Sequence, residues 1–252
     1  MNRRITVIVH RSPALYHAAK TVQSSLLGLR RIWWRRQSRG AIKRYFESHE
    51  RTKLELGAGQ LSCLGWLNTD LEPARASGSA PAVIYLDATR QFPFEDDTFE
   101  YIRSEHMIEH LSYDAARAML IECCRVMRRG GRIRIATPDL ARLVALYYER
   151  DHLSPEQDHY VRWIAEEFMD KSRATPQFVV NNAFRAWGHE FLFDEETLTA
   201  ILCEAGFTEV RRYEVGESDD PELIGSERHM CATENAAANE FETMVLEARK
   251  GA

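Results

Sequence analysis

A chain of 252 residues, 44% of them apolar, can bury a sizeable core; this excludes intrinsic disorder and favours one α/β domain with an insertion or an appendage. It contains no apolar run of about 18 residues, so no segment is expected to span a membrane. The five cysteines are scattered, with no Cys-x-x-Cys pair and no spacing typical of a disulfide framework, which predicts a reduced, cytoplasmic protein.

The net charge of −5 conceals a strong asymmetry along the chain. Residues 1–53 contain 13 lysines and arginines but 2 glutamates, whereas the rest of the chain contains 20 basic and 36 acidic residues. Apolar residues recur at helical spacing in the basic part, so residues 1–50 are expected to form a helical N-terminal extension. Residues 15–46 could lie on an anionic membrane surface, but we favour packing on the domain because Gly28 and Gly40 weaken the helix. The acidic remainder repels phosphates, so no nucleic-acid partner is expected.

The remainder of the chain alternates between short apolar runs and amphipathic helical segments. The runs expected to form strands are residues 52–56, 66–70, 82–86, 98–103, 132–137, 207–215 and 241–247. The clearest helices are residues 112–127 and 194–205, which begin at the N-cap residues Ser112 and Asp194. Strand–helix alternation followed by a closing strand pair predicts an α/β fold with a mainly parallel sheet and helices on both faces.

The first expected strand ends in a glycine pair, Leu54-Glu-Leu-Gly-Ala-Gly59. Glycines at a strand end leave backbone N–H groups accessible, so an anionic or polar ligand can approach the main chain. Asp70 and Asp87 end the next two strands, and His106 follows the fourth. Because the carboxyl ends of parallel strands meet at one edge of the sheet, these residues predict a site for a nucleotide-like cofactor.

Residues 140–190 interrupt the alternation of strands and helices. The segment is helical in pattern and rich in aromatic residues. These are Tyr147, Tyr148, Tyr160, Trp163, Phe168, Phe178, Phe184 and Trp187. An insertion at this point of an α/β chain lies over the carboxyl edge of the sheet, which predicts a lid over an acceptor site. Asn181, Asn182 and Arg185 could bind a polar acceptor, while the rings either stack on it or fill a core within the lid.

Six sequence motifs follow one another between residues 54 and 139. They are Leu54-Glu-Leu-Gly-Ala-Gly59, Trp66-Leu-Asn-Thr-Asp70, Asp87-Ala-Thr-Arg-Gln-Phe-Pro-Phe94, Glu95-Asp-Asp-Thr-Phe-Glu100, Ser104-Glu-His-Met-Ile-Glu-His-Leu111 and residues 125–139. In this order they resemble class I S-adenosylmethionine-dependent methyltransferases, and most of all the small-molecule subgroup with a short loop after the first strand. The resemblance covers residues 52–215, although Leu61 stands where the third glycine of the loop is expected.

This resemblance implies an enzyme with a Rossmann-like, doubly wound, seven-stranded and mainly parallel sheet that carries a helical lid insertion. Its cofactor would be S-adenosyl-L-methionine and its product S-adenosyl-L-homocysteine. Residues 51–139 would form the cofactor-binding half and residues 140–190 the acceptor lid. Residues 191–252 would supply the C-terminal helix and the closing strand pair of the same domain.

The resemblance also implies a role for each predicted cofactor contact. The methionine part would bind to Glu55, Gly57, Ala58 and Gly59. The ribose hydroxyls would bind to Asp70, which is followed by Leu71, and the adenine would bind to Asp87 with Ala88. The activated methyl group would lie near Ser104 and Glu105. Aspartates at strand ends also commonly cap turns. For Asp70 and Asp87 we favour the ligand interpretation, because both occur at the expected places.

Methyl transfer to a hydroxyl group needs a base that removes the acceptor's proton. His106 is the first candidate because imidazole titrates near neutral pH, and His189 is the second. Glu109 and His110 are expected to orient the start of the following helix. We expect a small-molecule acceptor and favour a hydroxyl group of a sugar or another hydroxylated metabolite, with N-methylation of a small amine as the alternative.

Two further classes of function compete with this interpretation. His106-Met-Ile-Glu-His110 matches the inverted zinc-peptidase motif, in which two histidines one helical turn apart bind zinc beside a general-base glutamate. We disfavour it and expect no metal, because His106 falls at a strand end and the motif leaves the glycine pair unexplained. The altered glycine loop also allows a non-catalytic module that binds the cofactor without turnover. The sequence leaves the oligomeric state open.

Overall fold

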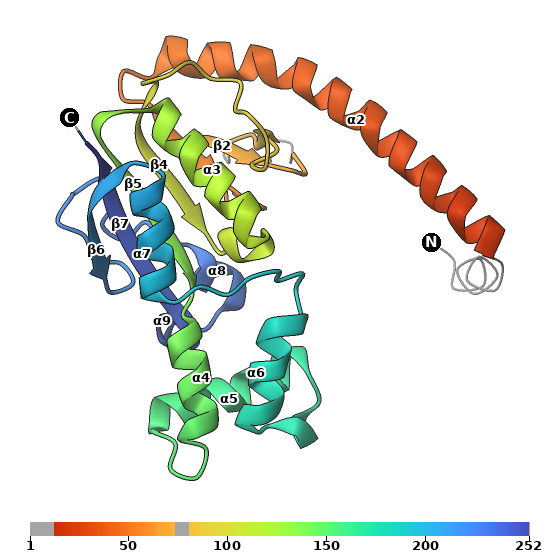
Figure 1. Ribbon diagram of the computed structural model, residues 1–252, viewed down its shortest axis with the longest axis vertical. Coiled ribbons are helices and arrows are strands. Elements are labelled where there is room, and N and C mark those ends of the chain that lie inside the picture. The colour runs from red at the N-terminus through yellow and green to blue at the C-terminus, as the bar shows by residue number, and fades with distance from the viewer. Residues whose placement is uncertain (1–12, 74–80, 252) are drawn as a thin grey trace. The chain divides into compact units, whose positions relative to one another are not determined.

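The computed structural model describes the backbone of residues 13–73 and 81–251 and, apart from Met230 and Ala232, the side chains from residue 30 onward within these ranges. The chain divides into two compact units, Met1–Ser48 and His49–Ala252. In the first unit, helix α2 extends over Pro13–Ser48 (Figure 1). Most of the apolar positions that define the predicted amphipathic stripe precede residue 30, so their side chains lie outside the described part. Among the described helices, none is both long and apolar enough to cross a membrane.

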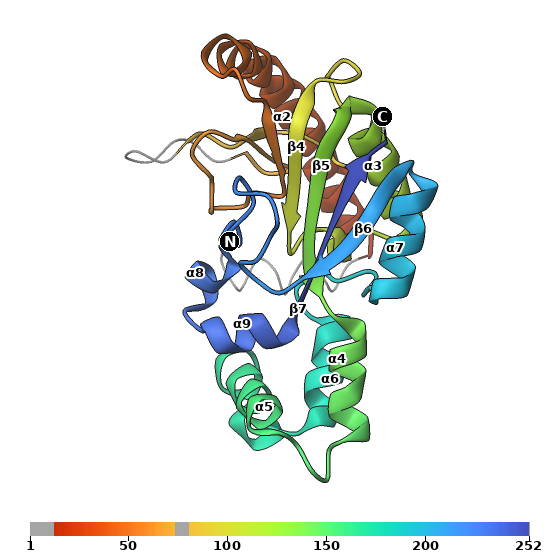
Figure 2. The same ribbon diagram turned by 90° about the vertical axis from the view of Figure 1, so that its left-hand side faces the viewer.

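The second unit is built on a seven-stranded sheet, which confirms the predicted fold class. Its strands are β1 (Lys53–Leu56), β2 (Leu67–Asp70), β3 (Ile84–Tyr85), β4 (Phe99–Glu105), β5 (Met127–Pro138), β6 (Phe207–Tyr213) and β7 (Thr243–Lys250). They lie in the order β3-β2-β1-β4-β5-β7-β6, with β7 antiparallel to both of its neighbours (Figure 2). The strand order reverses between β1 and β4, and a crevice for a ligand opens at the carboxyl ends of such a strand pair.

Two amphipathic helices pack together over one side of the sheet. Helix α3 (Tyr113–Val126) buries Met119, Leu120 and Cys123, and helix α7 (Glu195–Glu204) buries Leu198, Ile201 and Leu202. Ser112 and Asp194 cap their N-termini, each through its side-chain oxygen, as the sequence predicts. Helix α3 ends one residue before the predicted Met127, because that residue already has the extended conformation of β5.

The opposite side of the sheet carries buried arginines instead of an apolar layer. Arg103 on β4 lies directly beside Arg134 on β5, and both side chains are buried. Arg134 forms ion pairs with Glu227 and Glu247, and Arg103 donates a hydrogen bond to the backbone carbonyl of Ser226. Residues 214–228 are thereby fixed across this side and lead into the short helix α8 (His229–Thr233), so helices lie on both sides of the sheet (Figure 2).

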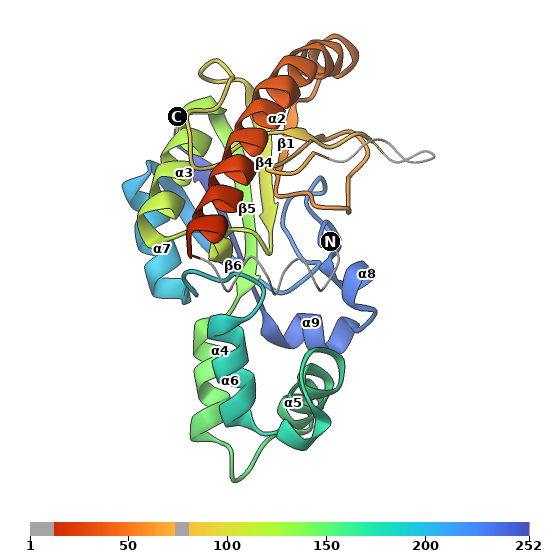
Figure 3. The ribbon, with the colours of Figure 1, turned by 90° about the vertical axis from the view of Figure 1, so that its right-hand side faces the viewer.

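The predicted insertion forms a separate helical layer beyond the carboxyl edge of the sheet (Figure 3). It consists of α4 (Leu140–Tyr148), α5 (Pro155–Phe168), the 3₁₀ turn η2 (Lys171–Arg173) and α6 (Pro176–Arg185). Helix α9 (Ala236–Glu242), just before β7, packs against α5. The layer has a core of its own, in which Tyr160, Ile164 and Val179 are buried. It therefore places a rigid helical surface above the ends of the strands.

Candidate active site

The glycine turn after β1 has the left-handed conformation that glycine adopts without strain. Gly57 has a φ of 72° and Gly59 a φ of 52°. A Cβ atom on Gly57 would lie 2.3 Å from Cγ of Met107, so this glycine is required for the close approach of Met107. A Cβ atom on Gly59 would meet nothing within 4 Å among the described residues. The turn is thus packed on one side and open on the other.

Asp70 ties the end of β2 to this glycine turn. One carboxylate oxygen accepts the N–H of Gly59 at 3.0 Å, and the other accepts the N–H of Glu72 at 2.8 Å. The residue lines a cavity of about 410 Å³ together with Leu71, Asp87 and Ala88. Each carboxylate oxygen can accept a second hydrogen bond, so the turn-capping role is compatible with the predicted ribose contact.

Asp87, like Asp70, both caps a turn and lines the cavity. Its Oδ1 accepts hydrogen bonds from the backbone N–H and the hydroxyl of Thr89, and its Oδ2 lies 3.2 Å from Nε of Arg90. It caps a turn, yet it remains part of the cavity wall. Six of the predicted contacts therefore line one cavity, namely Gly57, Gly59, Asp70, Leu71, Asp87 and Ala88.

The other predicted cofactor residues lie around the end of β4. Glu55 and Glu105 line a second, larger cavity of about 640 Å³ with Ala58, whereas Ser104 is fully buried and lines neither cavity. Glu55 pairs with Arg103 at 2.6 Å, and burial raises the pKa of this carboxyl to about 7 despite the arginine. Glu105 accepts the backbone N–H groups of Arg228 and His229 at 2.8 Å, so it holds the start of α8.

His106 is among the residues that line both cavities. It has a φ of 46°, and its backbone N–H donates to the carbonyl of Ala136 on β5. Its Nδ1 lies 3.3 Å from Oε1 of Glu109, and its Nε2 lies 3.1 Å from the hydroxyl of Thr243. Burial lowers the pKa of His106, but the hydrogen bond to Glu109 and its charge outweigh burial and raise the pKa to about 8.

Glu109 lies directly beside His106 and holds its ring. It lies in the 3₁₀ turn η1 (Ile108–His110), is fully buried, and accepts the hydroxyl of Thr137 at 3.0 Å through its second oxygen. Burial raises the pKa of this carboxyl, yet the contact with His106 more than reverses the shift, so the pKa is lowered. The glutamate therefore holds the imidazole in place as well as orienting the turn.

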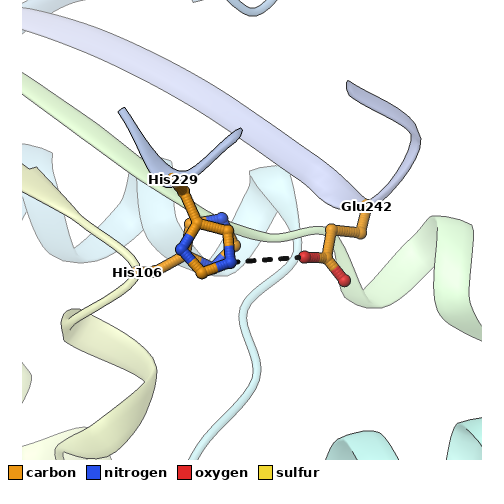
Figure 4. Close-up of side chains that lie close together, drawn as sticks. All are labelled: His106, His229 and Glu242. Carbon is orange, nitrogen blue, oxygen red and sulfur yellow. Dashed lines mark ion pairs between the residues drawn. The ribbon is translucent and has the colours of Figure 1, made fainter. Parts of the chain in front are cut away.

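The sequence did not single out His229 or Glu242, which the structure brings to the same site. The His229 ring stacks on the His106 ring, with 3.9 Å between centroids and 21° between planes (Figure 4). Oε1 of Glu242 lies 4.0 Å from Nε2 of His229, and its Oε2 accepts the hydroxyl of Tyr160 at 2.6 Å. Burial and the charge of His106 lower the pKa of His229 to about 3. The one local signal was the polar cluster Glu227-Arg-His229, far from His106 along the chain.

His189, the second predicted base, also lines the large cavity, beside Glu109 and His110. Its Nδ1 is 2.7 Å from the carbonyl of Ala183, and its ring makes an edge contact with His110 at 5.0 Å. Burial lowers its pKa. The three polar lid residues Asn181, Asn182 and Arg185 line neither of these two cavities, so the structure gives no support to their predicted acceptor contacts.

Two groups of side chains in the described residues have the composition of a metal site. One is His106, His229 and Glu242, and the other is Glu109, His110 and His189. His106 and His110 fall in different groups, so the inverted zinc-peptidase geometry is absent here. In the first group, stacked rings direct their nitrogen lone pairs along nearly parallel planes instead of towards one ion. We therefore maintain the prediction that the site holds no metal.

A doubly wound sheet, a glycine turn at its switch point and cavities on both sides of His106 define the class of the protein. They are the features of an enzyme that binds a nucleotide-like cofactor at the carboxyl edge of a parallel sheet.

The family model described as a methyltransferase domain matches residues 54–135, the part of the chain that contains β1–β4 and most of β5. With the strand order, this match supports a class I S-adenosylmethionine-dependent methyltransferase. It is an enzyme whose methyl donor is S-adenosylmethionine and whose product is S-adenosylhomocysteine. No curated protein matches the chain in sequence.

Solved structures of methyltransferases show a distant likeness. A S-adenosylmethionine-dependent methyltransferase from Archaeoglobus fulgidus is 18% identical, with a TM-score of 0.45, over 89% of this chain and 94% of that one. A Thermotoga maritima methyltransferase, described as a possible histamine N-methyltransferase, is 14% identical, with a TM-score of 0.43, over 80% of this chain and 82% of that one. Likenesses of this size give no information about the acceptor.

Proposed function

We propose that the enzyme methylates a hydroxyl group of a small hydroxylated metabolite such as a sugar, with His106 as the base. The observation that carries the proposal is the position of His106, which lines both cavities and is held by a buried carboxylate. In this arrangement the adenosine part of the donor occupies the side that contains Asp70 and Asp87, and its methionine part extends past the glycine turn to Glu55 in the large cavity. The acceptor occupies the rest of the large cavity, beneath the lid. The lid is residues 140–190, and the small-molecule subgroup with a short glycine loop remains our assignment.

The residues around the smaller cavity fit the cofactor. Gly59 leaves open space above the turn, and Asp70 and Asp87 each have unused acceptor capacity beside it. We assign the methionine part to Glu55, Gly57, Ala58 and Gly59, the ribose to Asp70 with Leu71, and the adenine to Asp87 with Ala88. We assign the region around the transferred methyl group to Glu105 and to Ser104, whose side chain is buried in β4. When bound, S-adenosylmethionine supplies a methyl group on a sulfonium that is already a strong electrophile.

The chain's own residues supply orientation and proton removal. With its Nδ1–H donated to Glu109, the neutral His106 ring has Nε2 as its basic atom. Nε2 contacts the Thr243 hydroxyl at 3.1 Å, so the acceptor hydroxyl would replace this contact before its proton is removed. His229 covers one face of the ring, so the imidazole cannot turn away from the cavity. His189 is the second candidate for the base, because it lines the same cavity beside Glu109.

N-methylation of a small amine is the alternative that a specific observation favours. The large cavity is lined by Glu55, Glu105, Glu109 and Glu242, a lining suited to a positively charged group. An amine acceptor would likewise transfer a proton to His106, so the base assignment holds for both reactions.

The test of the proposed function is cofactor binding measured by calorimetry. S-adenosylhomocysteine should bind with one site per chain, and Asp70→Ala should weaken binding by about 1.5–3 kcal/mol, the magnitude of a lost hydrogen bond to a charged group. The control is Glu167→Ala, which removes an exposed carboxylate of α5 that lines neither cavity. If the wild-type protein shows neither heat nor a thermal shift with millimolar ligand, the cofactor assignment is lost.

A further inference from the structure

We propose that the large cavity contains a subsite for a positively charged amine group of the acceptor, formed by the rings of Trp163, Phe168 and Trp187 and by the carboxylate of Glu242. The inference rests on the proposed function and narrows its substrate class. Among hydroxylated metabolites, the site would take those that also carry a protonated or quaternary amine, namely amino alcohols and amino sugars.

The three rings form a corner in the wall of the cavity. Phe168 lies between the two tryptophans, 5.3 Å from Trp163 at 86° and 5.2 Å from Trp187 at 90°. All three residues line the large cavity. A compact ammonium group is attracted to several ring faces at once, which such perpendicular rings provide, whereas a flat sugar ring needs one broad face.

Two of these rings, Phe168 and Trp187, lie outside the core of the lid, whereas Trp163 is partly buried and packs against it. Phe168 and Trp187 are each 45% exposed, and Tyr160 is the aromatic side chain that the lid buries. Trp187 has a φ of 56° and is followed by Gly188 at 85°, so two consecutive residues are left-handed. A bulky residue rarely adopts this conformation, and such strain is concentrated at functional sites. The backbone therefore holds the Trp187 ring at the cavity instead of burying it.

The charges of the lining favour a cation. Lysine and arginine do not occur among the described residues that line the cavity, which include four glutamates. Three of these glutamates have polar or charged partners within the chain: Glu55 pairs with Arg103, Glu109 with His106, and Glu105 accepts two backbone N–H groups.

Glu242 is the fourth glutamate, and neither of its two direct side-chain partners is positively charged at neutral pH. It is 8% exposed and accepts one hydrogen bond, from the hydroxyl of Tyr160. Its ion-pair partner at 4.0 Å is His229, whose depressed pKa keeps the ring uncharged at neutral pH. The positive charge of the nearby His106 ring also acts on Glu242, but burial has the larger effect and raises the pKa of this carboxyl. A buried carboxylate that is only partly compensated is unfavourable, and a cation on the ligand would add to the compensation. Glu242 and the three rings line the same cavity.

The experiment compares two probes of nearly identical shape on the full chain saturated with S-adenosylhomocysteine. Choline carries a quaternary nitrogen, and 3,3-dimethyl-1-butanol has a carbon atom in its place. Calorimetry should show that choline binds at least roughly tenfold more tightly, because a desolvated cation–aromatic contact is worth more than 1 kcal/mol.

Two substitutions locate the subsite. Glu242→Gln and Trp187→Leu should each weaken choline binding roughly tenfold, while the affinity for the neutral probe changes little. The matched controls are Glu240→Gln, an exposed glutamate on the same helix α9, and Tyr148→Leu, a lid ring that is 77% exposed and lines neither cavity. Both controls should bind choline as the wild type does. Unchanged binding of S-adenosylhomocysteine shows that each variant is folded.

Equal binding of the two probes would overturn the proposal, as would choline binding that survives both Glu242→Gln and Trp187→Leu. Tighter binding of methyl glucoside than of choline would also overturn it, in favour of a neutral sugar site. Failure of S-adenosylhomocysteine to bind would instead refute the proposed function, and the choline titration of the free protein would still decide whether the subsite exists.

Discussion

His106 joins a strained backbone, a buried carboxylate and a stacked imidazole in one residue. If it is the base, His106→Asn should retain cofactor affinity but lose about 10²–10⁴ in turnover, the usual contribution of a positioned base. The neutral imidazole is the active form, so the wild-type rate should rise as pH increases through about 8. Turnover measured against pH checks both statements, and the variant should lack the inflection.

A substitution of Glu109 tests the assignment of His106 as the base more specifically, through the pKa of the imidazole. Its negative charge raises the pKa of His106, so Glu109→Gln should move the inflection to lower pH while preserving the shape of the side chain. A carboxylate with only a structural role would leave the inflection in place. Should His106→Asn turn over normally with an unchanged pH profile, the base lies elsewhere, and His189 is the next candidate.

At the scale of secondary-structure elements, the junction between the sheet and the lid depends on Asp139. This aspartate follows β5 and is 1% exposed. It caps α4 by accepting the N–H groups of Ala141 and Arg142, and its second oxygen pairs with Arg212 of β6 at 2.6 Å. A single side chain therefore fixes the direction in which the first lid helix leaves the sheet.

Asp139→Ala should lower the free energy of unfolding by about 2–4 kcal/mol, through the lost cap and the lost charged hydrogen bond. Asp139→Asn keeps the capping oxygen and should cost less. Urea denaturation measures both. The control is Asp170→Ala, which removes the cap of the exposed turn η2 and should change stability by no more than about 0.5 kcal/mol. Equal effects at the two positions would show that Asp139 does not fix the lid.

At the scale of the whole molecule, buried ion pairs connect the sheet to the site. Arg134 is completely buried and pairs with Glu227 and Glu247, while Arg132 pairs with Asp219 and Asp220. These contacts fix residues 214–228. Because His229 follows this segment directly, they also position its ring against the ring of His106. The position of the His229 ring therefore depends on ion pairs on the side of the sheet opposite α3 and α7.

Arg134→Met should lower the free energy of unfolding by about 3–5 kcal/mol, because the buried Glu227 loses its cation and the buried Glu247 keeps only Arg132. Limited proteolysis should also become faster within residues 214–228. Arg128→Met, which breaks an ion pair on the surface with Glu100, should cost about 1 kcal/mol or less. Stability and proteolysis unchanged in Arg134→Met would show that the segment is held by other contacts.

Local chemistry explains which parts of this architecture could be predicted. The strands, the capped helices at Ser112 and Asp194, and the glycine turn follow from patterns within a few residues, and the structure confirms them. Asp70 and Asp87 reach one cavity because parallel strands align their carboxyl ends, a rule that needs no knowledge of side-chain packing. The assignment of these residues to the cofactor stays a prediction.

The rest of the site depends on contacts between segments that the sequence leaves unrelated. Nothing near His106 indicates that His229, which follows the lid and β6 in the sequence, will stack on its ring. Of the eight lid aromatics, folding buries Tyr160 and leaves Trp163, Phe168 and Trp187 at the cavity, although their helical spacing does not distinguish them. The sequence by itself determined the sheet, its glycine turn and the strand-end residues, because these depend on local geometry. Only the tertiary structure decided which distant side chains meet, because that depends on the long connections between the strands.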